Sequence, residues 1–217
     1  MTMLDSKGFD LWADGYDKAV GLSDEANSYP FAGYRRVLGR IFEIVTETGK
    51  PKGFPAGLPA VLDIGFGTAA LSAKLYERGF SIYGQDFSER MTALASAKMP
   101  GAKLFTGDFS NGLCAQLTIE RYDFIIATYS LHHLDDGRKI AFLRELLGLL
   151  NEGGSILIGD VAFETRAELE VCKASAGEEW DDDEFYFVAE EMKKAFPNME
   201  FEKTSFCAGV ITLKKEC

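Results

Sequence analysis

The stretch Val61-Leu62-Asp63-Ile64-Gly65-Phe66-Gly67-Thr68-Ala69-Ala70 joins a run of apolar residues to a turn that contains two glycines. Residues 60–64 have the composition of a buried β-strand, and residues 69–78 have the pattern of a helix. Glycine permits a sharp turn and lets a ligand approach the backbone, because no Cβ stands in the way. The helix that follows presents free N–H groups and its positive dipole end. The stretch therefore predicts a ligand-binding strand–turn–helix unit.

Strands and helices keep alternating along the chain after this unit. The pattern predicts further strands over 80–84, 102–106, 122–128 and 155–160, and helices over 88–98 and 135–150. Ser88 is the expected N-cap of its helix, and residues 151–154 (Asn-Glu-Gly-Gly) are the expected turn after the helix that ends at 150. Alternating elements with apolar strands predict a parallel sheet that has helices on both faces.

The two ends of the chain depart from this alternation. After a helix over 188–196, the pattern predicts strands over 199–205 and 209–213, joined by a loop too short for a parallel crossover, so this pair should be antiparallel. Residues 31–48 predict one further helix, which the prolines and glycines of 49–55 end. We expect an N-terminal helical lid over 1–53 and one compact domain over 54–217.

Composition and charge limit the classes of protein and partner. The 217 residues are 47% hydrophobic and 26% charged, as in globular proteins, and no run approaches the roughly 20 apolar residues of a membrane span. No signal peptide is visible, and the four cysteines lack the clustering of disulfide or zinc frameworks, so we expect a cytoplasmic protein with no membrane partner. The net charge of −11 makes a nucleic-acid partner unexpected. Residues 178–184 are strongly acidic and predict a solvated loop, or a rim that favours cationic substrates.

A carboxylate beyond the second strand points to the kind of ligand. Asp86 follows Gly67 by 19 residues, where it can accept both hydroxyls of a ribose. Gly65-x-Gly67-x-x-Ala70 fits the dinucleotide fingerprint, so an NAD-dependent oxidoreductase is one candidate. Asp63 argues against it, because a pyrophosphate gains nothing from a carboxylate, whereas an ammonium group such as that of S-adenosylmethionine (SAM) does. The antiparallel terminal pair is likewise unusual in a dinucleotide domain.

Several motifs together resemble one known family. Residues 61–69 resemble motif I of the class I SAM-dependent methyltransferases, and Asp86 within 83–88 matches the family's acid after the second strand. Gly107-Asp108-Phe109, residues 131–134 and residues 150–154 complete the set, which covers about residues 8–215. Residues 9–17 and 127–134 are most similar to small bacterial YrrT-like methyltransferases. Ala69 departs from the pattern, because it stands where the family commonly has a third glycine; we expect it to be tolerated.

The resemblance implies a fold and an activity. The fold would be a three-layer α/β Rossmann-like sandwich around a seven-stranded, mostly parallel sheet with an antiparallel last strand. The cofactor would be SAM, and the activity an in-line methyl transfer to a small-molecule acceptor, by a monomer or a homodimer. The acceptor and its reacting atom stay open. The alternatives are the NAD-dependent oxidoreductase and a non-catalytic SAM-binding protein.

The resemblance also implies roles for residues around the cofactor. Gly65 and Gly67 would pass beneath the methionine moiety, with Asp63 nearby, and Asp86 would hold the ribose hydroxyls. Asp108 would accept from the adenine amino group, with a turn-forming role as the alternative. Three apolar side chains would flank the adenine ring: Phe87, Met91 and Phe109. For Phe87 and Met91 the alternative is packing in the core.

Aromatic residues and Thr128 would surround the reacting methyl group. Thr128 and Tyr129 end the strand over 122–128, and an apolar pocket with Phe163 suits a sulfonium whose charge is lost in the reaction. In similar enzymes the tyrosine of a Trp-x-x-x-Tyr segment reaches the cofactor or closes the pocket. We therefore expect Tyr16 to act as a lid and Trp12 to pack against the sheet.

His132 and His133 are the two histidines of the chain and, with Tyr129, the candidates for a catalytic residue. No carboxylate lies at a fixed spacing that would support a histidine base, and two histidines are too few for a metal site. We expect no metal, and a loop that shapes the pocket and caps the next helix.

Overall fold

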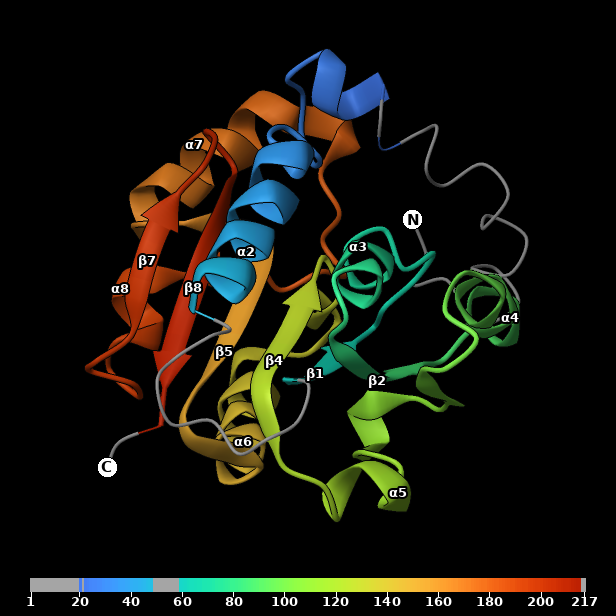
Figure 1. Cartoon of the computed structure of the whole chain (residues 1–217). Coiled ribbons are helices and arrows are strands. Elements are labelled where there is room, and N and C mark those ends of the chain that lie inside the picture. The colour runs from blue at the N-terminus through green and yellow to red at the C-terminus, as the bar shows by residue number, and fades with distance from the viewer. Residues whose placement is uncertain (1–19, 21, 49–58, 216–217) are drawn as a thin grey trace.

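The computed structural model describes residues 20, 22–48 and 59–215. Seven strands form a continuous sheet in the order β3-β2-β1-β4-β5-β8-β7, and a short strand, β6, pairs with the end of β5 (Figure 1). The pairs that β8 makes with β5 and β7 are antiparallel and the other pairs of this sheet are parallel, so the predicted sheet is confirmed. The strand bounds are β1 Ala60–Ile64, β2 Ser81–Asp86, β3 Lys103–Thr106, β4 Tyr122–Thr128, β5 Leu150–Phe163, β6 Phe187–Val188, β7 Glu200–Lys203 and β8 Ala208–Lys214.

Helices cover the sheet on both faces, as predicted (Figure 1). One apolar core lies beneath α2, α3, α4 and α7, and a second lies beneath α5, α6 and α8. Successive residues of β4 alternate between the two: Phe124 faces the first core, and Ile125 the second. The bounds are α2 Tyr34–Thr48, α3 Ser72–Glu77, α4 Glu89–Lys98, α5 Ala115–Thr118, α6 Asp136–Gly148, α7 Arg166–Ala176 and α8 Ala189–Met192, with 3-10 turns η1 Phe109–Asn111, η2 Leu131–His133 and η3 Gly177–Glu179.

The order of the strands reverses between β1 and β4. From β1 the chain builds outward through β2 to β3, then returns to β4 on the other side of β1. The connections on the two sides diverge at this point, which leaves a crevice at the carboxyl ends of the strands. The glycine turn after β1 lies at the edge of this crevice.

Three local predictions were wrong in their detail. Residues 151–154 belong to β5 instead of forming a turn, because a register shift between β4 and β5 accommodates them and the Asn151 amide donates to Asp123 at 2.8 Å. Helix α7 lies in the segment 161–187, where no helix was expected. The helix expected over 188–196 is limited to Ala189–Met192: it starts later because Phe187 and Val188 pair with β5, and residues 193–195 form turns. By contrast, Ser88 caps α4 as predicted and accepts from the Met91 N–H at 3.0 Å.

The region expected as a lid contains a core helix. Val37 and Ile41 of α2 are fully buried, and α2 packs on β5 and β8. Tyr16 and Trp12 lie outside the described residues, as does the proposed boundary at 53, so the lid and the division into two parts stay predictions.

Among the described helices, none has the length and apolarity to cross a membrane. Within the described part of the chain, Cys114, Cys172 and Cys207 are free thiols.

Gly159 of β5 allows α2 to approach the sheet. A Cβ added there would lie 2.2 Å from Val37 Cγ1 and 2.9 Å from Ile41 Cδ1. Gly159→Ala should therefore lower the free energy of unfolding by about 1–3 kcal/mol through overpacking, measured by urea denaturation. Gly39→Ala is the matched control, because Gly39 is an exposed position of α2 where an added Cβ would meet no atom within 4 Å. This substitution should raise the free energy of unfolding by up to about 1 kcal/mol. Equal effects of the two substitutions would contradict this account of the packing.

Candidate active site

The turn after β1 is built from residues in the left-handed region of backbone space. Gly65, Gly67 and Ala69 have φ values of +68°, +51° and +61°. A Cβ at Gly65 would lie 2.5 Å from that of Ser130, whereas a Cβ at Gly67 would project into open space. Ala69 is fully buried in a conformation that costs an L-residue roughly 1–2 kcal/mol. This left-handed residue also delays the start of α3 to Ser72, three residues after the predicted position.

A cleft opens over this turn and brings most of the predicted cofactor residues together. Predicted residues that line it are Asp63, Gly65, Gly67, Asp86, Phe87, Met91, Phe109, Thr128, Tyr129 and His133. Residues that the sequence analysis did not assign to the site also line it: Tyr34, Phe66, Thr68, Ala70, Leu71 and Ser130. Asp108, His132 and Phe163 are not among the lining residues, and Phe163 is fully buried in the core.

Asp86 fastens the turn to the end of β2. Its Oδ2 accepts the Gly67 N–H at 2.8 Å, and its Oδ1 accepts the Ser88 N–H at 2.9 Å. The residue is 3% exposed, so both oxygens are held in fixed directions. A carboxylate oxygen can accept more than one hydrogen bond, which leaves Asp86 able to receive two hydroxyls from a ligand.

Asp63 places an acceptor in the floor of the cleft. Ser72 Oγ donates to its Oδ2 at 2.6 Å, whereas its buried Oδ1 has no hydrogen-bond partner among the described residues. Burial, with a contribution from the charge of Asp86, raises the pKa of Asp63 to about 7, against the effect of the Ser72 hydrogen bond. A ligand that brings a positive charge or an N–H group to Oδ1 would satisfy this oxygen.

Asp108 and Phe109 follow the end of β3, and of the two only Phe109 lines the cleft. Asp108 caps η1, where it accepts from the Ser110 N–H at 2.8 Å and the Asn111 amide at 3.0 Å. Its role toward adenine stays a prediction, and the turn-forming role fits these bonds. Phe109 lines the cleft, and its ring stacks on Phe142 with centroids 5.9 Å apart, which fixes its orientation.

The opposite wall is aromatic. Tyr129 has a φ of +51°, and its N–H donates to the Gly159 carbonyl at 2.8 Å, so β4 and β5 hold this strained residue in place. Its ring lies 5.0 Å from that of Tyr34 and 5.5 Å from that of Phe31. Tyr34 was missed because its place in the helical apolar pattern predicted only core packing.

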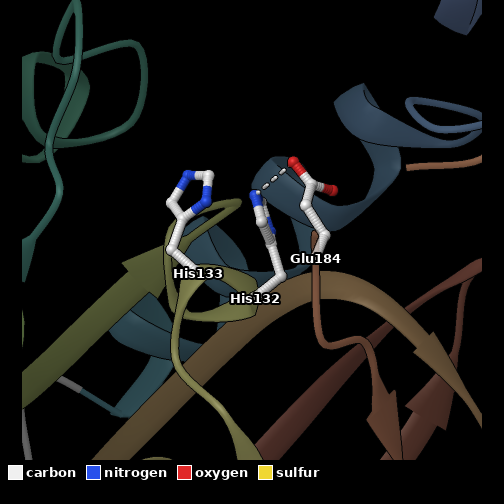
Figure 2. A group of neighbouring side chains, drawn as sticks. All are labelled: His132, His133 and Glu184. Carbon is white, nitrogen blue, oxygen red and sulfur yellow. Dashed lines mark ion pairs between the residues drawn. The ribbon is translucent and has the colours of Figure 1, made fainter. Parts of the chain in front are cut away.

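His132 has two carboxylate partners that sequence spacing did not reveal. Its Nδ1 lies 2.6 Å from Asp160 Oδ1. Its Nε2 lies 3.4 Å from Glu184 Oε1, as Figure 2 shows. Burial disfavours the charged ring, but the charge and hydrogen bond of Asp160 and the charge of Glu184 outweigh it and raise the pKa of His132. Burial and the neighbouring His132 lower the pKa of His133 to about 3. The expectation that no carboxylate supports these histidines is therefore wrong: Asp160 comes from β5, and Glu184 from the acidic segment.

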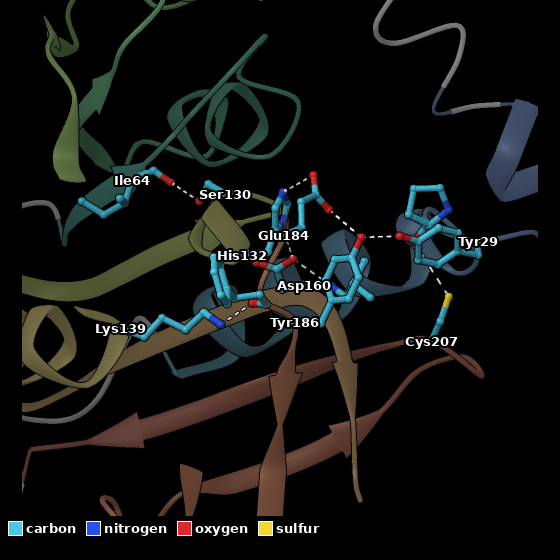
Figure 3. Close-up of polar contacts among 12 residues, drawn as sticks. Tyr29, Ile64, Ser130, His132, Lys139, Asp160, Glu184, Tyr186 and Cys207 are labelled. Carbon is cyan, nitrogen blue, oxygen red and sulfur yellow. Dashed lines mark hydrogen bonds and ion pairs between the residues drawn. The ribbon is translucent and has the colours of Figure 1, made fainter. Parts of the chain in front are cut away.

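A hydrogen-bond network extends from His132 to the N-terminal part of the described chain (Figure 3). The Tyr186 hydroxyl donates to Glu184 Oε2 at 2.6 Å and is also hydrogen-bonded to the Tyr29 hydroxyl. The Tyr29 ring stacks on Trp180 with centroids 5.2 Å apart. The acidic segment is thus only partly the solvated loop that was expected: Glu178 is exposed, but Glu184 is drawn into the network.

The raised pKa of Asp63 predicts a pH-dependent stability. The folded protein keeps the Asp63 proton up to about pH 7, whereas an unfolded aspartate releases it near 4, so the free energy of unfolding falls as the pH rises from about 4 to 7 and levels off above 7. Between pH 5.5 and 8, wild type should lose about 2 kcal/mol relative to Asp63→Asn, measured by urea denaturation. Glu178→Gln, at an exposed position, is the control and should follow wild type. If the free energy of unfolding depends on pH in the same way for wild type and Asp63→Asn, the pKa of Asp63 is not raised by folding.

Comparison with known proteins identifies the family. A methyltransferase-domain model matches residues 61–154. An uncharacterized methyltransferase of Geobacillus thermodenitrificans (strain NG80-2) is 32% identical over 201 residues, which cover 89% of this chain and 86% of that protein. The uncharacterized methyltransferase YrrT of Halobacillus halophilus is 26% identical over 201 residues, covering 89% and 87%.

A solved structure shares the fold. The magnesium protoporphyrin IX methyltransferase of Synechocystis with bound S-adenosylhomocysteine (SAH) superposes with a TM-score of 0.65 at 20% identity, over 86% of this chain and 85% of that one. These relatives support the methyltransferase over the NAD-dependent oxidoreductase. The chain belongs to the class I SAM-dependent methyltransferases, among the YrrT-like bacterial enzymes.

Proposed function

We propose that this methyltransferase transfers the methyl group of SAM to a small-molecule acceptor that enters beside Tyr129 and His133. The observation that carries the proposal is the cleft itself, in which a bare glycine turn and two buried aspartates lie opposite an aromatic wall. The Synechocystis enzyme is named for a small molecule, magnesium protoporphyrin IX. Between β5 and β8, the described chain adds only α7, α8 and short segments, with no separate domain for a large acceptor.

The residues present fit SAM. Asp63 Oδ1 is an acceptor without a partner among the described residues and would take the ammonium group of the methionine moiety. Open space above Gly67 leaves room for the cofactor on the backbone, and Asp86 would accept from the ribose. Phe109 would flank the adenine, with Phe87 and Met91 also on the cleft wall.

The chain's own contribution to the reaction is alignment and the exclusion of water. Bound SAM supplies a methyl group on a positively charged sulfur, which is an activated leaving group. Thr128 ends β4 at the cleft and Tyr129 follows it, and both would set the direction from which an acceptor approaches. The buried rings of Tyr129 and Phe109 and the partly buried Tyr34 line the cleft, where they would exclude water. An apolar surrounding solvates a charged sulfur less well than water does, so it would favour the loss of charge as the methyl group moves.

Asp86→Ala should weaken SAM and SAH binding by roughly 30- to 100-fold, because two charge-assisted hydrogen bonds to the ribose are lost. Isothermal titration calorimetry measures the change, and circular dichroism checks that the variant is folded. Glu89→Ala is the matched control, since Glu89 is the exposed first residue of α4. If Asp86→Ala binds SAH as tightly as Glu89→Ala does, the ribose does not lie on Asp86.

The acceptor class is tested by SAH formation. The purified full chain is incubated with SAM and with pooled small molecules that carry hydroxyl, thiol, amine or carboxylate groups, and in parallel with protein and RNA pools. The rate of SAH formation should exceed the rate without acceptor only when a small-molecule pool is present. SAH that rises with protein or RNA alone would refute the proposal, and tight SAM binding without turnover in any pool would favour the non-catalytic alternative.

A further inference from the structure

Two histidines and a glutamate from separate loops bring their side chains together beside the cleft (Figure 2). His132 and His133 belong to η2, and Glu184 lies between η3 and β6. One ligand atom of each residue lies within 4.8 Å of the other two. From the sequence no metal was expected, because two histidines are too few ligands; the fold adds Glu184 as a third.

Asp160 fixes the orientation of His132. A neutral imidazole has one N–H, and when Nδ1 donates it to Asp160 Oδ1 at 2.6 Å, the lone pair of Nε2 points away from Asp160. Nε2 then lies 3.4 Å from Glu184 Oε1, which is also an acceptor. Two acceptors repel one another, whereas a cation between them is attracted to both. A histidine held by a carboxylate on its far nitrogen is the usual arrangement of a metal-bound histidine.

Glu184 is oriented in a similar way. The Tyr186 hydroxyl donates to Oε2 at 2.6 Å, which leaves Oε1 directed toward His132. Tyr186 is in turn hydrogen-bonded to Tyr29 (Figure 3). The side chain of Glu184 is 23% exposed and that of His132 is 8% exposed, so both ligands are largely shielded from water.

We propose that His132, His133 and Glu184 bind a divalent transition-metal ion of the zinc class, with Asp160 and Tyr186 as positioning residues. Two imidazoles and one carboxylate are a ligand set of zinc sites that keep a coordination position open. His133 also lines the cofactor cleft, so the open position adjoins that cleft. This step rests on the proposed function. The acceptor would be a small molecule that ligates the metal through an oxygen or sulfur atom.

Metal binding is measured on the full chain after treatment with a chelator and dialysis. Titration with Zn²⁺ by calorimetry should show one ion per chain. Titration with Co²⁺ should give ligand-field absorption without the charge-transfer band of a thiolate, because the proposed ligands are two histidines and a glutamate. His133→Gln and Glu184→Gln should each weaken the affinity at least tenfold, and Asp160→Asn by about 10- to 100-fold.

Glu178→Gln is the matched control, since it changes an exposed glutamate in the same acidic segment and should bind Zn²⁺ as wild type does. Thermal unfolding checks that each variant is folded. Absence of stoichiometric binding in wild type would overturn the proposal. Binding that persists in Glu184→Gln, or that disappears in Cys114→Ser, would overturn it as well.

Calorimetry with SAH separates this inference from the proposed function. Glu184→Gln should bind SAH as wild type does, because Glu184 is not among the residues that line the cofactor cleft. Wild type that binds SAH but no metal contradicts only the metal site. Wild type that binds the metal but not SAH contradicts the proposed function and leaves the metal site standing.

Discussion

The hydrogen bond from the Gly67 N–H to the Asp86 carboxylate, 2.8 Å long, joins the turn after β1 to the end of β2. The same carboxylate accepts the Ser88 N–H, so the turn, the strand end and the start of α4 are held as one unit. Gly65, Gly67 and Ala69 keep their left-handed backbone conformation because this unit holds the turn in place. Asp63 lies beneath the turn and the aromatic wall lies opposite it. The position of this unit therefore sets the distance between the two sides of the cleft.

Buried carboxylates gather at the carboxyl ends of the central strands. Asp63 of β1, Asp86 of β2 and Asp160 of β5 are each at most 3% exposed. Burying negative charge is costly unless a hydrogen bond or a cation compensates it. Ser72 and backbone N–H groups compensate part of this cost, but one oxygen of Asp63 and one of Asp160 have no hydrogen-bond partner among the described residues. Ligands that bring positive charge to this edge of the sheet therefore match what the fold leaves uncompensated.

The sequence predicted the elements well where local chemistry decides them. The bounds of β1 and β4 and the Ser88 cap agree with the structure, because apolar runs and an N-cap act over a few residues. It failed where distant segments decide the outcome: residues 151–154 joined β5 through pairing with β4. The partners of His132 were invisible for the same reason, since Asp160 and Glu184 reach it only through tertiary structure. Tyr34 was missed because apolar periodicity does not separate a core residue from a cleft wall.

A crystal structure of the full chain with SAH tests the central claim most directly. The account predicts that the SAH amino group lies within hydrogen-bond distance of Asp63 Oδ1, that both ribose hydroxyls contact Asp86, and that the homocysteine chain rests on Gly65 and Gly67. A structure in which side chains of the protein fill the space above Gly67, or in which SAH lies away from the β1–β4 crevice, would contradict it.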